Sequence, residues 1–284
     1  MSAYANSHAL VSTEFVEKHK DDLTIVLVEV NMDAGAYEEG HIPGAIGWNW
    51  ETQLCDRKCR DILGPSRLEK LLCESGIARD TTILLYGDSN NWFAAWAFWQ
   101  LKIYGHPDVR LVDGGRRKWI EEKRELTTRL PIPKKATYKS NSIHQELRAF
   151  LPQVRQAAKG RSGSLVDVRS PEEYRGEILA PEGVKESSLR GGHIPGAKNI
   201  PAELACNDDG TFKSAPELKK LFKGRGVTPD NEVITYCRIG ERASHTWFVL
   251  KHLLGFPDVK NYDGSWTEWG NLVGVPIETG EEQA

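Results

Sequence analysis

The feature that most constrains this chain is an internal repeat. The segment Gly-His-Ile-Pro-Gly-Ala stands at 40–45 and again, letter for letter, at 192–197. Further along, Ile83–Tyr86 resembles Val233–Tyr236 at nearly the same spacing of about 150 residues. Chance seldom repeats six residues at a spacing that other segments share, so we interpret the chain as a duplicated domain.

The length of the chain agrees with two domains. Its 284 residues are about twice the length of a typical domain. Between the copies, residues 127–141 contain two prolines and several basic residues without apolar periodicity, which predicts a linker. We therefore expect one domain over 1–126 and another over 142–284.

Each half alternates short apolar runs with segments of helical spacing. Leu165–Val168 and Glu232–Tyr236 are typical of buried parallel strands, whereas 215–222 and 244–254 have helical spacing. This order predicts an α/β protein with two tandem domains, each a parallel sheet with helices on both faces. In such sheets the reactive loops lie beyond the carboxyl ends of the strands.

Charge and cysteine usage limit the possible functions. A net charge of -3 supplies no overall attraction to nucleic acid or an anionic membrane. No apolar run reaches the roughly 18 residues that span a bilayer, and the N-terminus lacks a signal-peptide pattern. The five cysteines form no disulfide framework, and Cys55 and Cys59 lack a second pair at zinc spacing. We expect a cytoplasmic protein with reduced thiols, without a metal site or a membrane or nucleic-acid partner.

The two copies differ after the strands that end at Tyr86 and Tyr236. The first continues Gly-Asp-Ser-Asn-Asn-Trp-Phe and the second Cys-Arg-Ile-Gly-Glu-Arg-Ala. Features that both copies share, such as His41 and His193 in the repeated turns, are explained by the fold. A thiol and two guanidinium groups in one copy alone indicate a functional site there.

Cys237 stands where a predicted strand ends and a helix begins. Backbone N–H groups converge in such a loop, and the helix dipole is positive there; here the donors are Ile239, Gly240, Glu241 and Ala243. Because Arg238 and Arg242 add positive charge, we expect the pKa of Cys237 to lie below its ordinary value of about 8.5. The same donors could share the negative charge of a persulfide.

Three features of the sequence occur together: two Gly-His-Ile-Pro-Gly-Ala turns, a Cys-Arg-x-Gly-x-Arg loop in the second half alone, and the segment Tyr262–Trp266. With these features the chain resembles the tandem-domain rhodaneses, the thiosulfate sulfurtransferases. The resemblance implies that Cys237 forms the persulfide, that Arg242 binds the substrate anion, and that the first half is catalytically silent. It also implies ping-pong transfer of the outer sulfur of thiosulfate to cyanide or another thiophilic acceptor, which could be a thiol protein, without a cofactor.

Other features of the sequence concern the donor. Arg238 favours thiosulfate, since the 3-mercaptopyruvate branch of the family has a neutral loop. However, Ile239 stands where animal thiosulfate enzymes have a basic residue, and a further family arginine aligns with Glu173. Arg175, two positions on, is our candidate for the second anion contact. The second copy also has 15 extra residues between Tyr174 and His193, including Lys185 and Arg190.

Three alternatives stay open. The first is a 3-mercaptopyruvate sulfurtransferase, and the second is a carrier that delivers its persulfide to a partner protein. The third and most remote is a cysteine-based phosphatase or arsenate reductase. Phosphatases of the rhodanese fold place five residues between cysteine and arginine, whereas here four separate Cys237 from Arg242.

Overall fold

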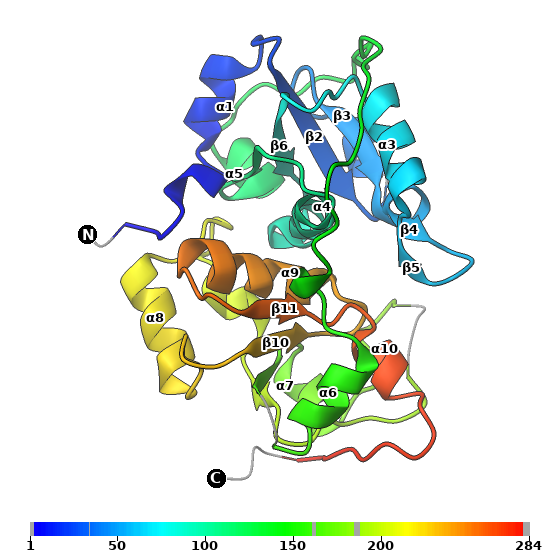
Figure 1. Ribbon diagram of the computed structural model, residues 1–284. Coiled ribbons are helices and arrows are strands. Elements are labelled where there is room, and N and C mark those ends of the chain that lie inside the picture. The colour runs from blue at the N-terminus through cyan, green and yellow to red at the C-terminus, as the bar shows by residue number, and fades with distance from the viewer. Residues whose placement is uncertain (1–2, 34, 161–162, 185–187, 281–284) are drawn as a thin grey trace. The chain divides into compact units, whose positions relative to one another are not determined.

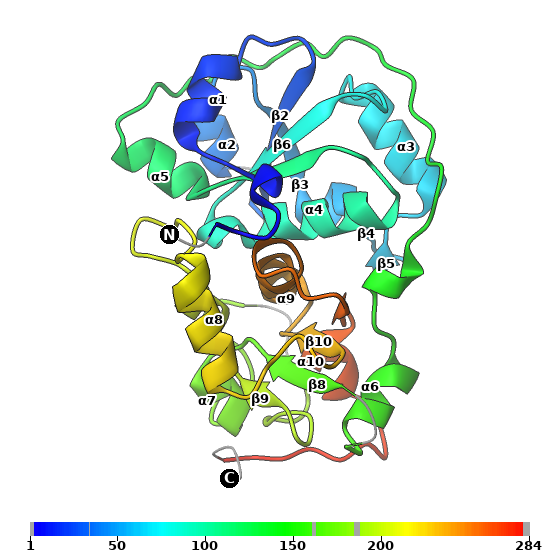
Figure 2. The same ribbon diagram turned by 60° about the vertical axis from the view of Figure 1, so that its left-hand side comes forward.

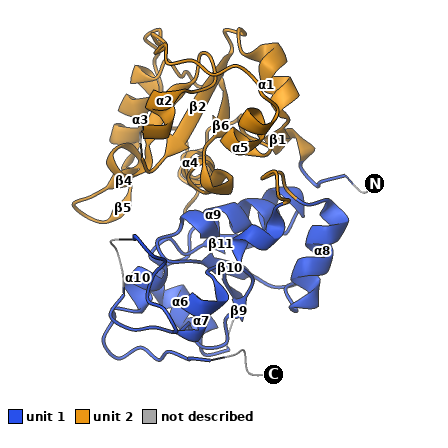
Figure 3. Ribbon diagram, turned by 180° about the vertical axis from the view of Figure 1, so that it is seen from behind, with its two compact units in different colours: residues 1–6, 146–206, 213–284 blue, residues 7–145, 207–212 orange. Residues whose placement is uncertain are grey.

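A computed structural model describes residues 3–33, 35–160, 163–184 and 188–280 (Figure 1). It divides into two compact units that exchange short segments of chain (Figure 3). Unit 1 comprises Met1–Asn6, Glu146–Cys206 and Lys213–Ala284, and unit 2 comprises Ser7–Gln145 and Asn207–Phe212. The predicted boundaries, with domains over 1–126 and 142–284 and a linker over 127–141, stay a prediction.

Unit 2 contains a five-stranded parallel sheet in the order β1-β7-β6-β2-β3. Its strands are β1 (Leu10–Val11), β2 (Ile25–Asn31), β3 (Ile46–Asn49), β6 (Thr82–Tyr86) and β7 (Val109–Val112), and β4 (Cys55–Asp56) pairs antiparallel with β5 (Asp61–Ile62). Its helices are α1 (Thr13–His19), α2 (Gly35–Glu39), α3 (Pro65–Glu74), α4 (Trp92–Ile103) and α5 (Gly115–Glu121). Figure 2 shows α1 and α5 on one side of this sheet and α3 and α4 on the other.

Unit 1 contains a four-stranded parallel sheet in the order β11-β10-β8-β9. Its strands are β8 (Ser164–Asp167), β9 (Lys198–Asn199), β10 (Val233–Tyr236) and β11 (Val259–Asn261). Its helices are α6 (Leu151–Ala157), α7 (Pro171–Arg175), α8 (Ala215–Gly224), α9 (Glu241–Phe248) and α10 (Ser265–Trp269).

Strand alternation explains why both faces of this second sheet are covered. Ile234 and Tyr236 point to a core that includes Val154 of α6 and Trp266 of α10. Thr235 lies between them and points the opposite way, and its hydroxyl donates to the carbonyl of Ala243 in α9 at 3.1 Å. The predicted α/β class, with two parallel sheets wrapped by helices, is confirmed.

The repeated turns have the same structural role in both units. The hydroxyl of Tyr86 accepts the N–H of Ile42, and that of Tyr236 accepts the N–H of Ile194, each at 3.1 Å. His193 stacks on Tyr174 with ring centres 3.6 Å apart, as its counterpart in unit 2 does on the equivalent tyrosine at 3.9 Å. The structural interpretation of these histidines is confirmed.

The exchanged segments are held by specific contacts. Within unit 2, the N–H of Phe212 donates to Asp113 at 2.9 Å, and Lys118 binds Asp209 at 2.7 Å. Within unit 1, the N–H of Ala5 donates to the carbonyl of Leu253 at 2.9 Å. Across the described ranges, no helix combines the length and apolar character needed to cross a membrane.

Candidate active site

Cys237 follows β10 directly and is fully buried. Its N–H donates to the hydroxyl of Ser265 at 3.1 Å, and its carbonyl accepts the N–H of Trp266 at 3.0 Å. Ser265 has a φ of 53°, a left-handed conformation that non-glycine residues seldom adopt, and its hydroxyl donates to the carbonyl of Tyr262 at 2.7 Å. The first turn of α10 therefore fixes the backbone of the cysteine.

The sulfur of Cys237 accepts a backbone hydrogen bond. The N–H of Gly240 lies 3.0 Å from Sγ, and the N–H of Ala243, in the first turn of α9, also lowers the pKa of the thiol. Gly240 has a φ of 104°, which a residue with a Cβ adopts only with strain. Two of the four predicted backbone donors therefore act on the sulfur, and for Ile239 and the amide of Glu241 that role stays a prediction.

The thiol also faces a carboxylate. Sγ donates to Oε2 of Glu241 at 3.3 Å. Burial and then the Glu241 charge raise the pKa of Cys237 to about 11, outweighing Arg242 and the two amides. The lowered pKa that we expected from the sequence is therefore wrong for this structure, because neither burial nor the direction of the Glu241 side chain can be inferred from residue spacing.

Arg242 forms a buried ion pair with Glu173. The guanidinium donates to the two carboxylate oxygens at 2.7 and 3.0 Å, and the side chains are 7% and 0% exposed. Burial alone would raise the pKa of Glu173, but Arg242 holds it below its ordinary value. Burial alone would lower the pKa of Arg242, and the contact with Glu173 raises it instead.

In the sequence, Glu173 stands only where the family has an arginine. A signal for its orientation was present, because Ser170 and Glu173 have the spacing of a capping box, and the Glu173 carboxylate accepts the Ser170 N–H at 3.1 Å. Its partner Arg242 lies 69 positions away, so the ion pair itself was not predictable.

The other two predicted cationic residues lie in different settings. Arg238 is buried in the loop, and its carbonyl accepts the N–H and the hydroxyl of Thr267, both at 3.0 Å. Arg175 ends α7 and binds Glu177 through Nε at 2.7 Å and Nη2 at 2.9 Å. Substrate contacts by Arg238, Arg242 and Arg175 stay predictions.

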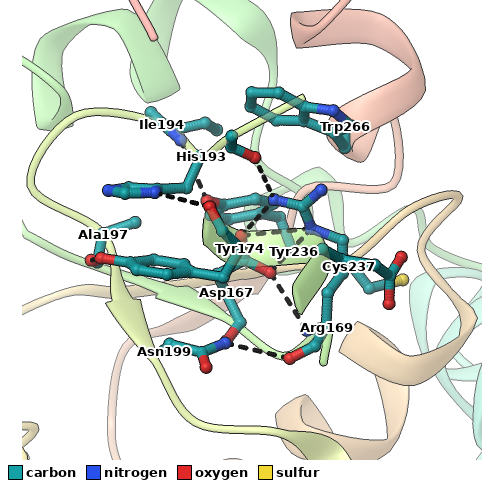
Figure 4. A network of polar contacts seen from close by, with 12 residues as sticks. Asp167, Arg169, Tyr174, His193, Ile194, Ala197, Asn199, Tyr236, Cys237 and Trp266 are labelled. Atoms are coloured by element: carbon teal, nitrogen blue, oxygen red, sulfur yellow. Dashed lines mark hydrogen bonds and ion pairs between the residues drawn. The ribbon is translucent and has the colours of Figure 1, made fainter. Parts of the chain in front are cut away.

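A second buried ion pair lies at the end of the neighbouring strand (Figure 4). Arg169 binds Asp167 through Nε at 2.9 Å and Nη2 at 2.5 Å, and its guanidinium packs 4.6 Å from the Trp266 ring. Asp167 pairs in register with Tyr236, the residue before Cys237. No motif in the sequence points to this arginine.

The equivalent acid in unit 2 is Glu29, which pairs in register with Tyr86. Its carboxylate accepts from Nδ2 of Asn31 at 2.7 Å and from Nη1 of Arg116 at 3.2 Å. Both units therefore neutralise a buried acid beside the strand tyrosine, but with arginines from different elements.

The loop after Tyr86 has no thiol, and asparagine side chains from the loop and from the end of β2 accept two of its backbone N–H groups. Oδ1 of Asn91 accepts the Gly87 N–H, and Oδ1 of Asn31 accepts the Asp88 N–H, each at 2.9 Å. Ser89, Asn90 and Asn91 all have positive φ, so the chain follows a different path from the Cys237 loop. These contacts agree with the proposal of a catalytically silent half.

The end of the insertion between Tyr174 and His193 is attached to α10 and the turn that follows it. The Arg190 guanidinium donates to the carbonyls of Trp269, Gly270, Leu272 and Val275 at 2.9 to 3.0 Å. Ser188 donates to the carbonyl of Trp266 at 3.0 Å. Lys185 lies outside the described residues. Since α10 also holds the Cys237 backbone, Arg190 supports the site from the outside.

This fold and site define a cysteine-centred protein built from two copies of one α/β domain. A family model described as "Rhodanese-like domain" matches residues 12–122 and 151–272, and the chain belongs to this family. It is a sulfurtransferase with two rhodanese-like domains, and several of its relatives are named putative thiosulfate sulfurtransferases.

Two relatives match over nearly their whole length. "Sulfur carrier protein TtuD" from Thermus thermophilus is 52% identical over 283 residues, covering 98% of this chain and 99% of the relative. "Putative thiosulfate sulfurtransferase" from Haloferax volcanii is 50% identical over 284 residues, with the same coverage.

A solved structure is also similar. The anaerobic ergothioneine biosynthesis enzyme from Chlorobium limicola, in complex with trimethyl histidine, has a TM-score of 0.86 at 26% identity, covering 99% of this chain and 72% of that one. A structure of EanB as a cysteine persulfide with ergothioneine has a TM-score of 0.87 at 26% identity, with 99% and 73% coverage.

Proposed function

We propose that this protein moves the outer sulfur of thiosulfate to a thiophilic acceptor, such as cyanide or a thiol, through a persulfide on Cys237. The observation that carries the proposal is the sulfur of Cys237 at the start of α9, 3.0 Å from the Gly240 N–H. A backbone donor fixed in this position stabilises negative charge on a persulfide as well as on a thiolate.

The chemistry has two steps. The Cys237 thiolate attacks the outer sulfur of thiosulfate, the bond between that sulfur and the sulfonate breaks, and sulfite leaves with the bonding electrons. The acceptor then attacks the outer sulfur of the persulfide, and the thiolate of Cys237 is released. Arg238 and Arg242, and Arg175 as a third candidate, would bind the sulfonate group.

The test is intact-protein mass spectrometry after treatment with thiosulfate. We expect a gain of one sulfur atom, located on the Cys237 peptide, and its loss when cyanide is added. Cys237→Ser should abolish the gain, whereas Cys206→Ser, which removes another buried thiol of unit 1, should retain it. A Cys237→Ser variant that still gains sulfur and forms thiocyanate would overturn the proposal.

A second candidate function is delivery of the persulfide to a partner protein. It is supported by the relative named as a sulfur carrier, at 52% identity over nearly the whole chain. The carboxylates of Glu241 and Glu173 also offset the two loop arginines, which weakens the attraction for a dianionic donor. A Cys237 persulfide that forms readily but is not discharged by cyanide would favour the carrier.

The donor is tested separately. We expect steady-state transfer to be faster with thiosulfate than with 3-mercaptopyruvate, because Arg238 adds positive charge next to the cysteine. Equal or faster transfer from 3-mercaptopyruvate would reverse the assignment of the donor while leaving the persulfide of Cys237 in place.

A further inference from the structure

We propose that Glu241 is a catalytic residue, which takes the proton of the Cys237 thiol and passes it to the sulfite that leaves thiosulfate. This role rests on the proposed function, because it concerns the first of its two steps. The sequence suggested this residue as a backbone donor.

The geometry places the carboxylate on the reacting atom. Oε2 of Glu241 lies 3.3 Å from Sγ of Cys237, with the thiol as donor, and the Glu241 side chain is only 6% exposed. Glu241 is the first residue of α9, four positions after the cysteine, so its carboxylate lies where the helix dipole is positive. A base this close can take the proton without an intervening water.

The neighbouring carboxylates of Glu173 and Asp167 are bound by arginines, whereas the carboxylate of Glu241 is directed at the thiol. Oε1 of Glu241 lies 3.6 Å from Nε of Arg242, whose two terminal nitrogens bind Glu173 from α7. At the end of β8, Asp167 is bound by Arg169. The contacts from α10 are uncharged: the hydroxyl of Ser265 accepts the Cys237 N–H, and the N–H of Trp266 donates to the Cys237 carbonyl.

The transfer also moves the negative charge of the pair onto the nucleophile. A carboxylate beside the sulfur would repel a thiosulfate dianion, and at these distances in a buried site the repulsion is substantial. When the proton moves from the thiol to Glu241, the pair still carries one negative charge, but this charge now lies on the nucleophile. The neutral carboxyl group can then donate a hydrogen bond to the substrate.

The step balances as follows. Glu241 takes the proton of Cys237, the thiolate forms a bond to the outer sulfur of thiosulfate, and the bond from that sulfur to the sulfonate breaks. The departing sulfite takes the bonding electrons and the proton from Glu241, and it leaves as hydrogensulfite. The products are the Cys237 persulfide anion and a carboxylate that is again ready to accept a proton.

The experiment compares two rates at the same pH in the full chain and in Glu241→Gln. One is alkylation of Cys237 by iodoacetamide, followed on its own peptide, which measures the thiolate. The other is release of sulfite in a single turnover with thiosulfate. We expect alkylation to become at least about tenfold faster, because the neighbouring charge is gone. We expect the ratio of sulfite release to alkylation to fall about 100-fold, because the proton donor is gone.

Two further variants complete the design. Glu203→Gln makes the same change at an exposed position of unit 1 and should leave both rates unchanged. Glu241→Asp keeps a carboxyl group, so its ratio should recover to within about tenfold of the unmodified chain. Circular dichroism establishes that each variant is folded, and a Glu241→Gln variant that does not fold leaves Glu241→Asp to be compared with Glu241→Asn.

The outcomes are distinct. If alkylation of the Glu241→Gln variant is unchanged, or if its sulfite release rises in step with alkylation, Glu241 does not carry the proton. If the unmodified chain forms no persulfide and releases no sulfite, the proposed function itself fails, whatever the variants do.

Discussion

Replacing Arg242 by methionine tests whether its buried ion pair holds the active-site loop. The guanidinium binds Glu173 in two places, at 2.7 and 3.0 Å, and the Glu173 side chain is 0% exposed. Arg242→Met leaves that carboxylate buried with the Ser170 N–H as a remaining donor. Removing one partner of such a pair costs about 3–5 kcal/mol of unfolding free energy.

The assay is urea denaturation of the full chain and three variants. With a denaturant dependence of about 1–3 kcal/mol per molar urea, the midpoint of Arg242→Met should fall by at least about 1 M. Glu173→Gln removes the charge that binds both terminal nitrogens of Arg242, and the midpoint of this variant should fall similarly. The double variant buries neither charge, so it should be no less stable than the weaker single variant, which is strongly non-additive.

The pH dependence adds a second check. The pKa of Glu173 in the folded chain is lowered, so the stability contributed by the pair is complete above the unfolded pKa of about 4.3. This stability is lost as the pH falls through the folded pKa. The difference between the unmodified chain and Arg242→Met should therefore shrink in acid. Additive single variants, or a loss below about 1 kcal/mol at neutral pH, would refute the reasoning.

Three other predictions concern the same loop and its support. Gly240→Ala should cost about 1–2 kcal/mol of stability and slow persulfide formation, because the φ of Gly240 is 104°. The control Gly224→Ala, in α8 with open space around it, should have neither effect. Equal effects of the two variants on the urea midpoint would contradict this. Arg190→Ala removes four hydrogen bonds to carbonyl groups and should lower stability by about 1.5–3 kcal/mol, as measured by urea denaturation. Amide hydrogen exchange in α10 should also become faster. Unchanged exchange would argue against the role of Arg190. The rate of alkylation of Cys237 should rise about tenfold per pH unit above neutrality, with a midpoint near pH 11. A plateau of this rate below pH 9 would show that burial and Glu241 do not set the pKa of the thiol.

The duplication predicted most of the fold from the sequence. Strand and helix patterns are local and periodic, so β10 and α8 lie within two residues of the segments expected at 232–236 and 215–222. Comparing the two copies also separated residues that maintain the fold, such as His193, from the loop that begins at Cys237. That comparison needed no structure, because both copies are part of the same amino-acid sequence.

Tertiary structure decided the electrostatics of the site. Arg242 meets Glu173 across 69 positions, and the direction of the Glu241 side chain depends on how α9 packs. Neither contact follows from residue spacing. A local pattern predicts on which face of a helix or strand a residue lies, but it does not predict which charged residue from a distant segment packs against it. The sequence alone therefore pointed to Cys237 as the nucleophile that we propose. Only the fold decided that its thiol is buried against a carboxylate, because burial and long-range pairing arise when distant segments pack together.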